Sequence, residues 1–221
     1  MRRRIRALAV LLPYLVFSLT CVLVAAYAFA FLFRSHSPHN PFAVQFAISG
    51  WDVPAHFFGA GLALLLAPLQ LSTYVRRYWP ALHRIGGWLY ASAVLIGGIS
   101  GLSLAPAAQT GLPSAIGFAM LALLWLGVTG NGIRLAVIGD TAGHRTWMAY
   151  SIALTAAAIT LRLMLGLGDL FRFPFAATYI TAAWCSWLIN LAVCAWLLRH
   201  HARRGARVAG DRHSVSRRPT A

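Results

Sequence analysis

Three histidines and one arginine are the residues of this sequence whose types and positions point most directly to chemistry. His56, His83 and His144 each stand at the mouth of a long apolar stretch, and Arg162 stands inside one. Imidazole is a usual axial ligand of haem iron. A charge at the centre of a membrane helix costs roughly 2.5–3.5 kcal/mol or more. We therefore expect these four side chains to face other protein segments or a bound group rather than lipid.

The arginine needs a partner, and the sequence offers few. Asp52 and Asp169 are the two acidic residues placed near the same end of the apolar stretches as Arg162. Asp52 lies one helical turn before His56, so we expect Asp52 to be the counter-ion of Arg162. A structural ion pair and a contact to an anion or cofactor are both open interpretations of this arginine.

Three further polar residues accompany the histidines. Gln70 is an uncharged amide deep in an apolar stretch, two residues after Pro68, which we expect to kink its helix. Arg84 and Arg145 directly follow the second and third histidine. We include all three as candidate site residues.

The elements that must position these residues are membrane helices. Of the 221 residues, 59% are hydrophobic and 10% are charged, against about 25% charged in soluble domains. A helical crossing needs about 20 residues, so six crossings with short loops fill the chain. We predict an all-α transmembrane domain over residues 1–199 and a disordered basic tail over 200–221. Apolar patterning and Pro and Gly breaks place the crossings at about 7–33, 53–74, 85–104, 114–139, 147–166 and 176–199.

The arginines orient these crossings. All 19 basic residues are arginine, and 16 of them fall on one side: four before the first crossing, three and two in later loops, and seven in the tail. The positive-inside rule then predicts an inner-membrane protein with both termini in the cytoplasm. The arginines also fit contacts with anionic lipid headgroups better than a nucleic-acid surface. The first crossing also resembles a signal peptide, since Ala26-Tyr27-Ala28 is a possible cleavage site, but its length favours an uncleaved helix.

Each of the three histidines shares a helix face with small or polar residues. The relevant faces combine His56 with Gly59, Ala63 and Gln70, His83 with Gly87, Tyr90 and Gly97, and His144 with Ser151, Thr155 and Arg162. Such faces are most often used for helix packing, and Gly97-x-x-x-Gly101 fits that use. A binding site and a packing surface both remain open.

The same residues resemble a known family. The first motif is His56-x-x-Gly59, then Pro68-Leu69-Gln70, Arg77 and His83-Arg84-x-x-Gly87; the second is His144-Arg145-x-x-Met148-x-x-Ser151 with Leu161-Arg162. Together they resemble the family of domains of unknown function numbered 2306, over roughly residues 50–165. The resemblance implies a bacterial multi-pass membrane protein and no particular reaction.

A looser likeness is to cytochrome b-type transmembrane electron carriers, which hold haem between histidines of neighbouring helices. Here His83 and His144 start on the same side of the membrane and would ligate the iron of one b haem. His56 lies at the other side, where only His36 or His39 would partner it. The chain therefore departs from a two-haem set, and it has no C-x-x-C-H attachment motif.

Three functions follow as hypotheses. The first is a haem- or quinone-linked membrane redox protein, with Arg162 contacting a propionate or headgroup. The second is a small transporter or channel, suggested by the expected kink at Pro68 and the polar faces. The third is an accessory subunit that binds a membrane-protein partner or a second copy of itself. The sequence shows no hydrolytic site or phosphate-binding loop of a soluble enzyme.

Overall fold

The protein is all-helical wherever its structure is described. The computed structural model describes the backbone of residues 2–33 and 50–216 and the side chains of residues 11–32 and 50–203. Arg34, His36 and His39 lie outside these residues. The elements, in chain order, are α1 (Arg2–Phe33), α3 (Asp52–Leu71), α4 (Thr73–Tyr78), α5 (Pro80–Leu104), η1 (Ala105–Ala107), α6 (Leu112–Val137), α7 (Thr141–Thr155), α8 (Ala157–Leu170) and α9 (Phe175–Ser216).

Six helical segments within the described residues are long and apolar enough to cross a membrane, which confirms the predicted number. They are Leu11–Leu32, Asp52–Leu71, Pro80–Ala107, Leu112–Val137, Thr141–Leu170 and Phe175–Arg203. Large apolar side chains cover their outer faces, for example Leu95, Leu123 and Val193, each more than half exposed. Such a surface suits lipid and not water.

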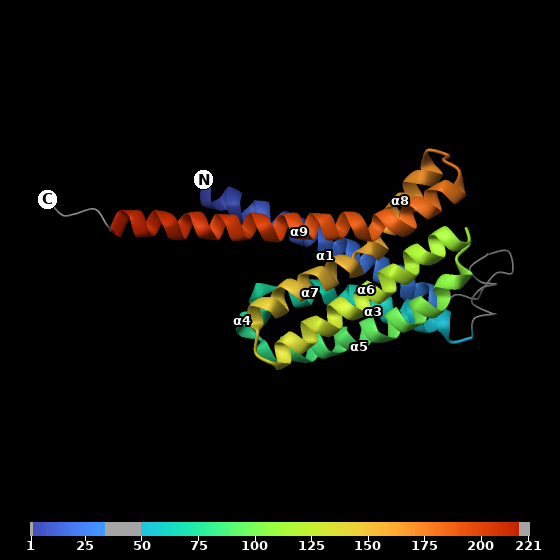
Figure 1. The fold of residues 1–221 in the computed structure, drawn as a ribbon, viewed down its shortest axis with the longest axis horizontal. Coiled ribbons are helices and arrows are strands. Elements are labelled where there is room, and N and C mark those ends of the chain that lie inside the picture. The colour runs from blue at the N-terminus through green and yellow to red at the C-terminus, as the bar shows by residue number, and fades with distance from the viewer. Residues whose placement is uncertain (1, 34–49, 217–221) are drawn as a thin grey trace.

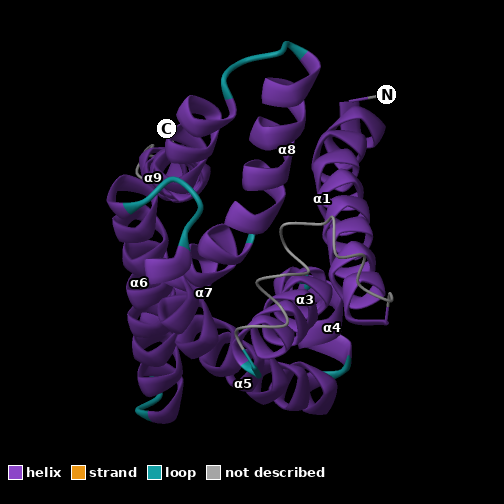
Figure 2. Ribbon diagram, turned by 90° about the vertical axis from the view of Figure 1, so that its right-hand side faces the viewer, coloured by secondary structure: helices purple, strands orange, loops and turns teal. Residues whose placement is uncertain are grey.

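The chain alternates between two ends of the bundle. Figure 1 shows the start of α1, the end of α9, α4 and the α6–α7 turn toward one end, and the α5–α6 and α8–α9 connections toward the other. The first of these we call the arginine-rich end, because Arg76, Arg84 and Arg145 lie there. Figure 2 shows α8 between α1 on one side and α6 and α9 on the other.

Short local signals set the helix boundaries at the arginine-rich end. Gly139, with φ of 84°, ends α6, and the Asp140 carboxylate then caps α7 by accepting from the Gly143 N–H at 2.9 Å. A carboxylate at this position satisfies an N–H that no helix carbonyl can reach. Pro80 begins α5, where its missing N–H costs nothing.

The second crossing differs from the prediction at its end. α3 stops at Leu71 rather than at residue 74, and Ser72 then caps the separate short helix α4. Pro68 lies in the last turn of α3, which continues as one helix from Asp52 to Leu71. A proline so close to a helix end disturbs few backbone hydrogen bonds.

The helix of the fifth crossing is interrupted near its middle. Its two halves, α7 and α8, meet at Ala156, although we predicted one continuous helix over 147–166. His144 and Arg162 therefore do not share the face of one straight helix. Asn190 of α9 joins the two halves: its amide nitrogen donates to the Ala153 carbonyl at 3.1 Å, and its oxygen accepts from the Thr160 hydroxyl at 2.9 Å. In a membrane such side-chain partners make a helix break tolerable.

The last helix also differs from the prediction. α9 continues from the sixth crossing to Ser216, so the backbone of residues 200–216 is helical where we predicted a disordered tail. This segment is rich in Ala and Arg, both strong helix formers.

Glycines bring α3 and α5 into close contact, and among the described helices this pair has the most extensive contact. A Cβ on Gly59 would lie 2.5 Å from the Gly97 nitrogen and 2.7 Å from the Ala93 carbonyl oxygen. The backbones thus touch directly, as small residues allow in membrane helices. The packing role expected for Gly97 is confirmed.

We predict that Gly59→Ala lowers the apparent unfolding temperature in mild detergent. The added methyl group forces α3 and α5 apart, at about 1–3 kcal/mol for overpacking of this kind. The matched control is Gly127→Ala on α6, whose added methyl group meets open space. Thermal unfolding followed by tryptophan fluorescence makes the comparison, and equal midpoints for the two variants would contradict the close contact.

Candidate functional site

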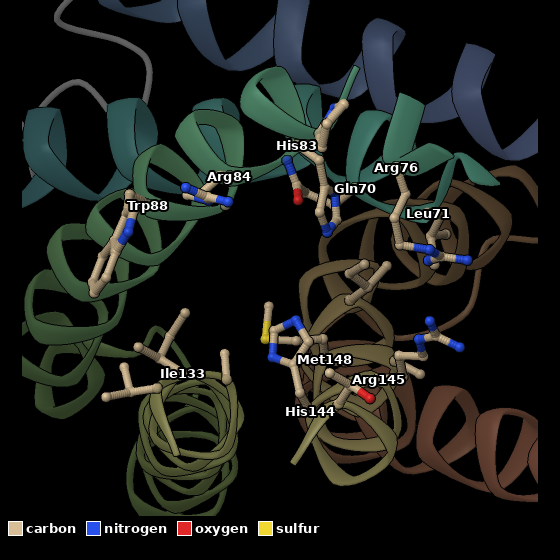
Figure 3. A pocket seen from close by; sticks show the side chains of 17 residues that line it. Gln70, Leu71, Arg76, His83, Arg84, Trp88, Ile133, His144, Arg145 and Met148 are labelled. Atoms are coloured by element: carbon tan, nitrogen blue, oxygen red, sulfur yellow. The ribbon is translucent and has the colours of Figure 1, made fainter. Parts of the chain in front are cut away.

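A cavity of about 570 Å³ lies at the arginine-rich end between α3, α5, α6 and α7. This volume is in the range of cofactor and ligand sites. Both His83 and His144 line it, and Figure 3 shows their imidazoles pointing toward one another across it, one from α5 and one from α7. The other lining residues are Gln70, Leu71, Arg76, Pro80, Arg84, Gly87, Trp88, Ile133, Ala136, Val137, Thr141, Arg145, Met148, Ala149 and Ile152.

The polar lining of this cavity is cationic. It holds three arginines, of which Arg76 and Arg145 lie on one side of the imidazoles and Arg84 on the other (Figure 3), and no carboxylate is among the described residues that line it. Arg84 and Arg145 were predicted as site residues, but Arg76 was not. Arg76 lies on the short helix α4, which was not predicted from the sequence and which places the Arg76 side chain beside the cavity. The cavity therefore suits a ligand with an apolar body and negative groups.

His144 is held in one orientation by a backbone group. Its Nδ1 lies 2.8 Å from the Gly132 carbonyl oxygen on α6. Because a carbonyl oxygen only accepts, Nδ1 carries the proton and Nε2 keeps its lone pair. Metal-bound histidines are commonly oriented by such a hydrogen bond.

His83 is held by Gln70 from the neighbouring helix α3. Two backbone groups decide how the Gln70 amide is turned: its oxygen accepts from the Gly87 N–H at 3.1 Å, and its nitrogen donates to the His83 carbonyl at 3.2 Å. The same nitrogen lies 3.1 Å from His83 Nδ1, which therefore accepts, and in the neutral ring Nε2 carries the proton. Gln70 is buried and lines the cavity, so this sequence-predicted residue lies at the candidate site.

A buried group of hydroxyls fixes the helices that carry the two histidines. The Tyr90 hydroxyl of α5 lies 2.8 Å from the Ser151 hydroxyl and 2.6 Å from the Thr155 hydroxyl, both on α7. The Ser151 hydroxyl also lies 2.6 Å from the Thr129 hydroxyl of α6, and the Trp125 indole donates to Thr155 at 3.0 Å. We call these five residues the hydroxyl cluster. It ties α5, α6 and α7 together directly below the cavity.

The hydroxyl cluster was only partly visible in the sequence. Ser151, Thr155 and Tyr90 were placed on the faces that carry His83 and His144, but nothing in the sequence showed that the two faces meet. Thr129 and Trp125 were not identified at all. A single-sequence pattern gives the face of a helix but not its neighbour.

His56 and Asp52 lie at the opposite end and take no part in the cavity. His56 Nδ1 lies 2.8 Å from the Gly97 carbonyl oxygen, and its ring packs against Gly101. The Asp52 carboxylate accepts from the Ser103 hydroxyl at 2.6 Å. Both residues therefore connect α3 to α5.

Arg162 does not form the ion pair with Asp52 that we predicted. Its guanidinium donates to the Ala158 carbonyl at 2.9 Å and lies 5.5 Å from the centre of the Tyr27 ring. The break at Ala156 explains the difference, because it separates Arg162 from the direction of α7 and places it beside α1. Arg162 is therefore separate from the His83–His144 cavity.

We predict that Tyr90→Phe lowers the apparent unfolding temperature by about 2–4 °C, the shift that roughly 1 kcal/mol produces in a protein of this size. The change removes one hydroxyl from the buried cluster and leaves the ring in place. Tyr74→Phe on the exposed face is the control and should leave the midpoint unchanged. Equal effects of the two substitutions would show that the cluster contributes nothing to stability.

The comparisons with known proteins agree with the fold. A search of the curated proteins and a search of the solved structures each found no match. A family described as "Predicted membrane protein (DUF2306)" matches residues 53–198, which include the cavity, the hydroxyl cluster and five of the six crossings. The match covers well over half of the chain, so this protein is a multi-pass membrane protein that belongs to the DUF2306 family.

Proposed function

We propose that this protein is a b-type haem protein of the membrane, in which His83 and His144 would hold the haem iron. The observation that carries the proposal is the pair of opposed imidazoles inside a cationic cavity with apolar walls. Two imidazoles from neighbouring helices match the ligand set of a b haem. The chemistry that the haem would supply is the transfer of single electrons.

The number of donor groups favours haem over a free metal ion. Among the described residues, no group of three or more His, Cys, Asp or Glu side chains is placed to hold a metal ion. A free zinc or copper ion would need such a group. Haem needs only two protein ligands, because the porphyrin supplies the other four.

The three arginines support the same ligand. Arg76, Arg84 and Arg145 surround the imidazoles without any carboxylate among the cavity-lining residues to neutralise them. Guanidinium groups bind carboxylates with paired hydrogen bonds. The propionates of a haem are carboxylates, and the apolar lining residues Leu71, Ile133 and Met148 suit its macrocycle.

One observation favours a second candidate, a quinol. Without a ligand, His83 presents an N–H to the cavity and His144 presents a lone pair. A phenolic hydroxyl accepts from the first and donates to the second. Haem ligation instead needs the lone pair of His83 Nε2, which requires the Gln70 amide to turn its oxygen toward Nδ1. A quinol leaves the three arginines without an anion, which is why we place it second.

We also propose that the arginine-rich end faces the cytoplasm of a bacterial cell and that the protein lies in the inner membrane. The distribution of arginines supports this orientation. The cavity would then be reached from the cytoplasmic side. The transporter and accessory-subunit hypotheses stay predictions from the sequence.

We predict that protein purified from haem-supplied cells shows a Soret band, and that His83→Ala and His144→Ala each abolish it. Either change removes one axial ligand. His56→Ala is the control, since His56 lies at the other end of the bundle and should leave the spectrum intact. Size-exclusion profiles establish that each variant is folded.

Two results would overturn the haem proposal. One is a colourless wild-type protein with no haem in a pyridine assay. The other is a Soret band that depends on His56 but not on His83. A colourless protein that binds a ubiquinol analogue in a manner dependent on His83 would support the quinol instead.

We predict that Gln70→Leu weakens haem retention by about 10–100-fold, the usual effect of losing the group that orients a metal-bound histidine. Gln70→Glu keeps an acceptor for the Nδ1–H of a ligated His83, so haem should stay and its midpoint potential should fall. Gln109→Leu, an exposed position at the opposite end, is the control. Dilution-induced haem loss and redox titration provide the measurements, and identical behaviour of all three variants would rule out a role for Gln70.

A further inference from the structure

Arg162 is a cation inside a membrane crossing, and among the side chains that the structure describes no carboxylate forms an ion pair with it. The sequence contains only four acidic residues. Asp140 caps α7 at the arginine-rich end, and Asp52 is bonded to Ser103. Asp169 lies two turns along α8 from Arg162, and Asp211 lies beyond the last crossing. Since an intramembrane charge is costly, an anion from outside the chain would stabilise Arg162 beyond its bond to the Ala158 carbonyl.

The side chain of Arg162 points toward the middle of the membrane rather than toward the nearer membrane surface. Arginines near a crossing's end usually extend toward the nearer interface. The nearer end of α8 is Leu170, yet the Arg162 guanidinium reaches back to the Ala158 carbonyl, one turn toward the middle of the crossing. The guanidinium therefore lies deeper than the end of the crossing, and a phosphate bound to it would lie deeper than those of the surrounding lipids.

The surroundings of Arg162 leave one side open to lipid. One turn earlier, Ile159 packs against Cys21 and Ala25 of α1, so α8 and α1 are in contact there. Tyr27 of α1, whose ring lies under the guanidinium, is 54% exposed, and on the protein side the guanidinium lies near His56 of α3. The single hydrogen bond to Ala158 uses one of five N–H donors within the part of the chain that the structure describes.

We propose that Arg162 binds the phosphate of a phospholipid headgroup, which enters between α1 and α8 from the leaflet opposite the arginine-rich end. The guanidinium donates paired hydrogen bonds to the phosphate oxygens. Tyr27 holds the guanidinium in place through its ring. The chemistry is that of an oxyanion, and the open side toward lipid favours a headgroup over a soluble phosphate.

Native mass spectrometry of the full chain in mild detergent tests this proposal. Phosphatidylglycerol is the probe, and diacylglycerol and inorganic phosphate are the comparison ligands. We expect one tightly retained phosphatidylglycerol, at least tenfold less retention in Arg162→Gln, and no change in Arg172→Gln, which removes an arginine from the α8–α9 turn. Diacylglycerol should not be retained, because it lacks the phosphate.

A second pair of variants keeps Arg162 in place. A Cβ on Gly166 meets no other atom within 4 Å, so a longer side chain fits there, one turn along α8. Gly166→Glu supplies an internal carboxylate at the i+4 position, which should pair with Arg162 and displace the lipid. Gly166→Gln is the uncharged control and should retain it.

The proposal fails if Gly166→Glu retains phosphatidylglycerol as the wild type does, or if a folded Arg162→Gln does so. It also fails if inorganic phosphate competes fully with the lipid, since the bound oxyanion would then be a soluble one. Because Gly166→Glu keeps Arg162, its result decides the matter even if Arg162→Gln does not fold.

Discussion

The structure depends on one constraint: inside a bilayer, every polar group must find its partner within the protein or in a bound molecule. The hydroxyl cluster of Tyr90, Ser151 and Thr155 satisfies this constraint for α5 and α7, and Asn190 satisfies it where the fifth crossing breaks. These contacts hold three helices at fixed positions. The cavity above the cluster takes its shape from them.

Close packing and open space occur at different levels of the same helix pair. Where Gly59 meets Gly97, the backbones of α3 and α5 touch. About three turns toward the arginine-rich end, Gln70 replaces glycine at the contact, and its amide joins α3 to His83 and Gly87 in the first turns of α5. The helices are thus joined by van der Waals contact at one level and by hydrogen bonds at the other, and the second kind of contact leaves room for a ligand.

The number and approximate positions of the crossings could be predicted from the sequence, because apolar length and arginine placement are strong signals. Five residues that the sequence predicts as site candidates line one cavity in the structure: His83, His144, Gln70, Arg84 and Arg145. The break at Ala156 was not predictable in this way. It follows from side chains on another helix, chiefly Asn190, and the error over Arg162 follows from the break.

The Gln70 bridge also bears on how the chain can vary in length. It joins the end of α3 to the first turns of α5, and only Ser72, α4 and Trp79 lie between these two helices. This connection is short, so an inserted residue there could be accommodated only by moving α4 or by drawing Gly87 away from the amide. The connection around η1, at the far end of α5, is free of this restriction. Length variation among proteins built on this plan should therefore gather at the end of the bundle away from the cavity.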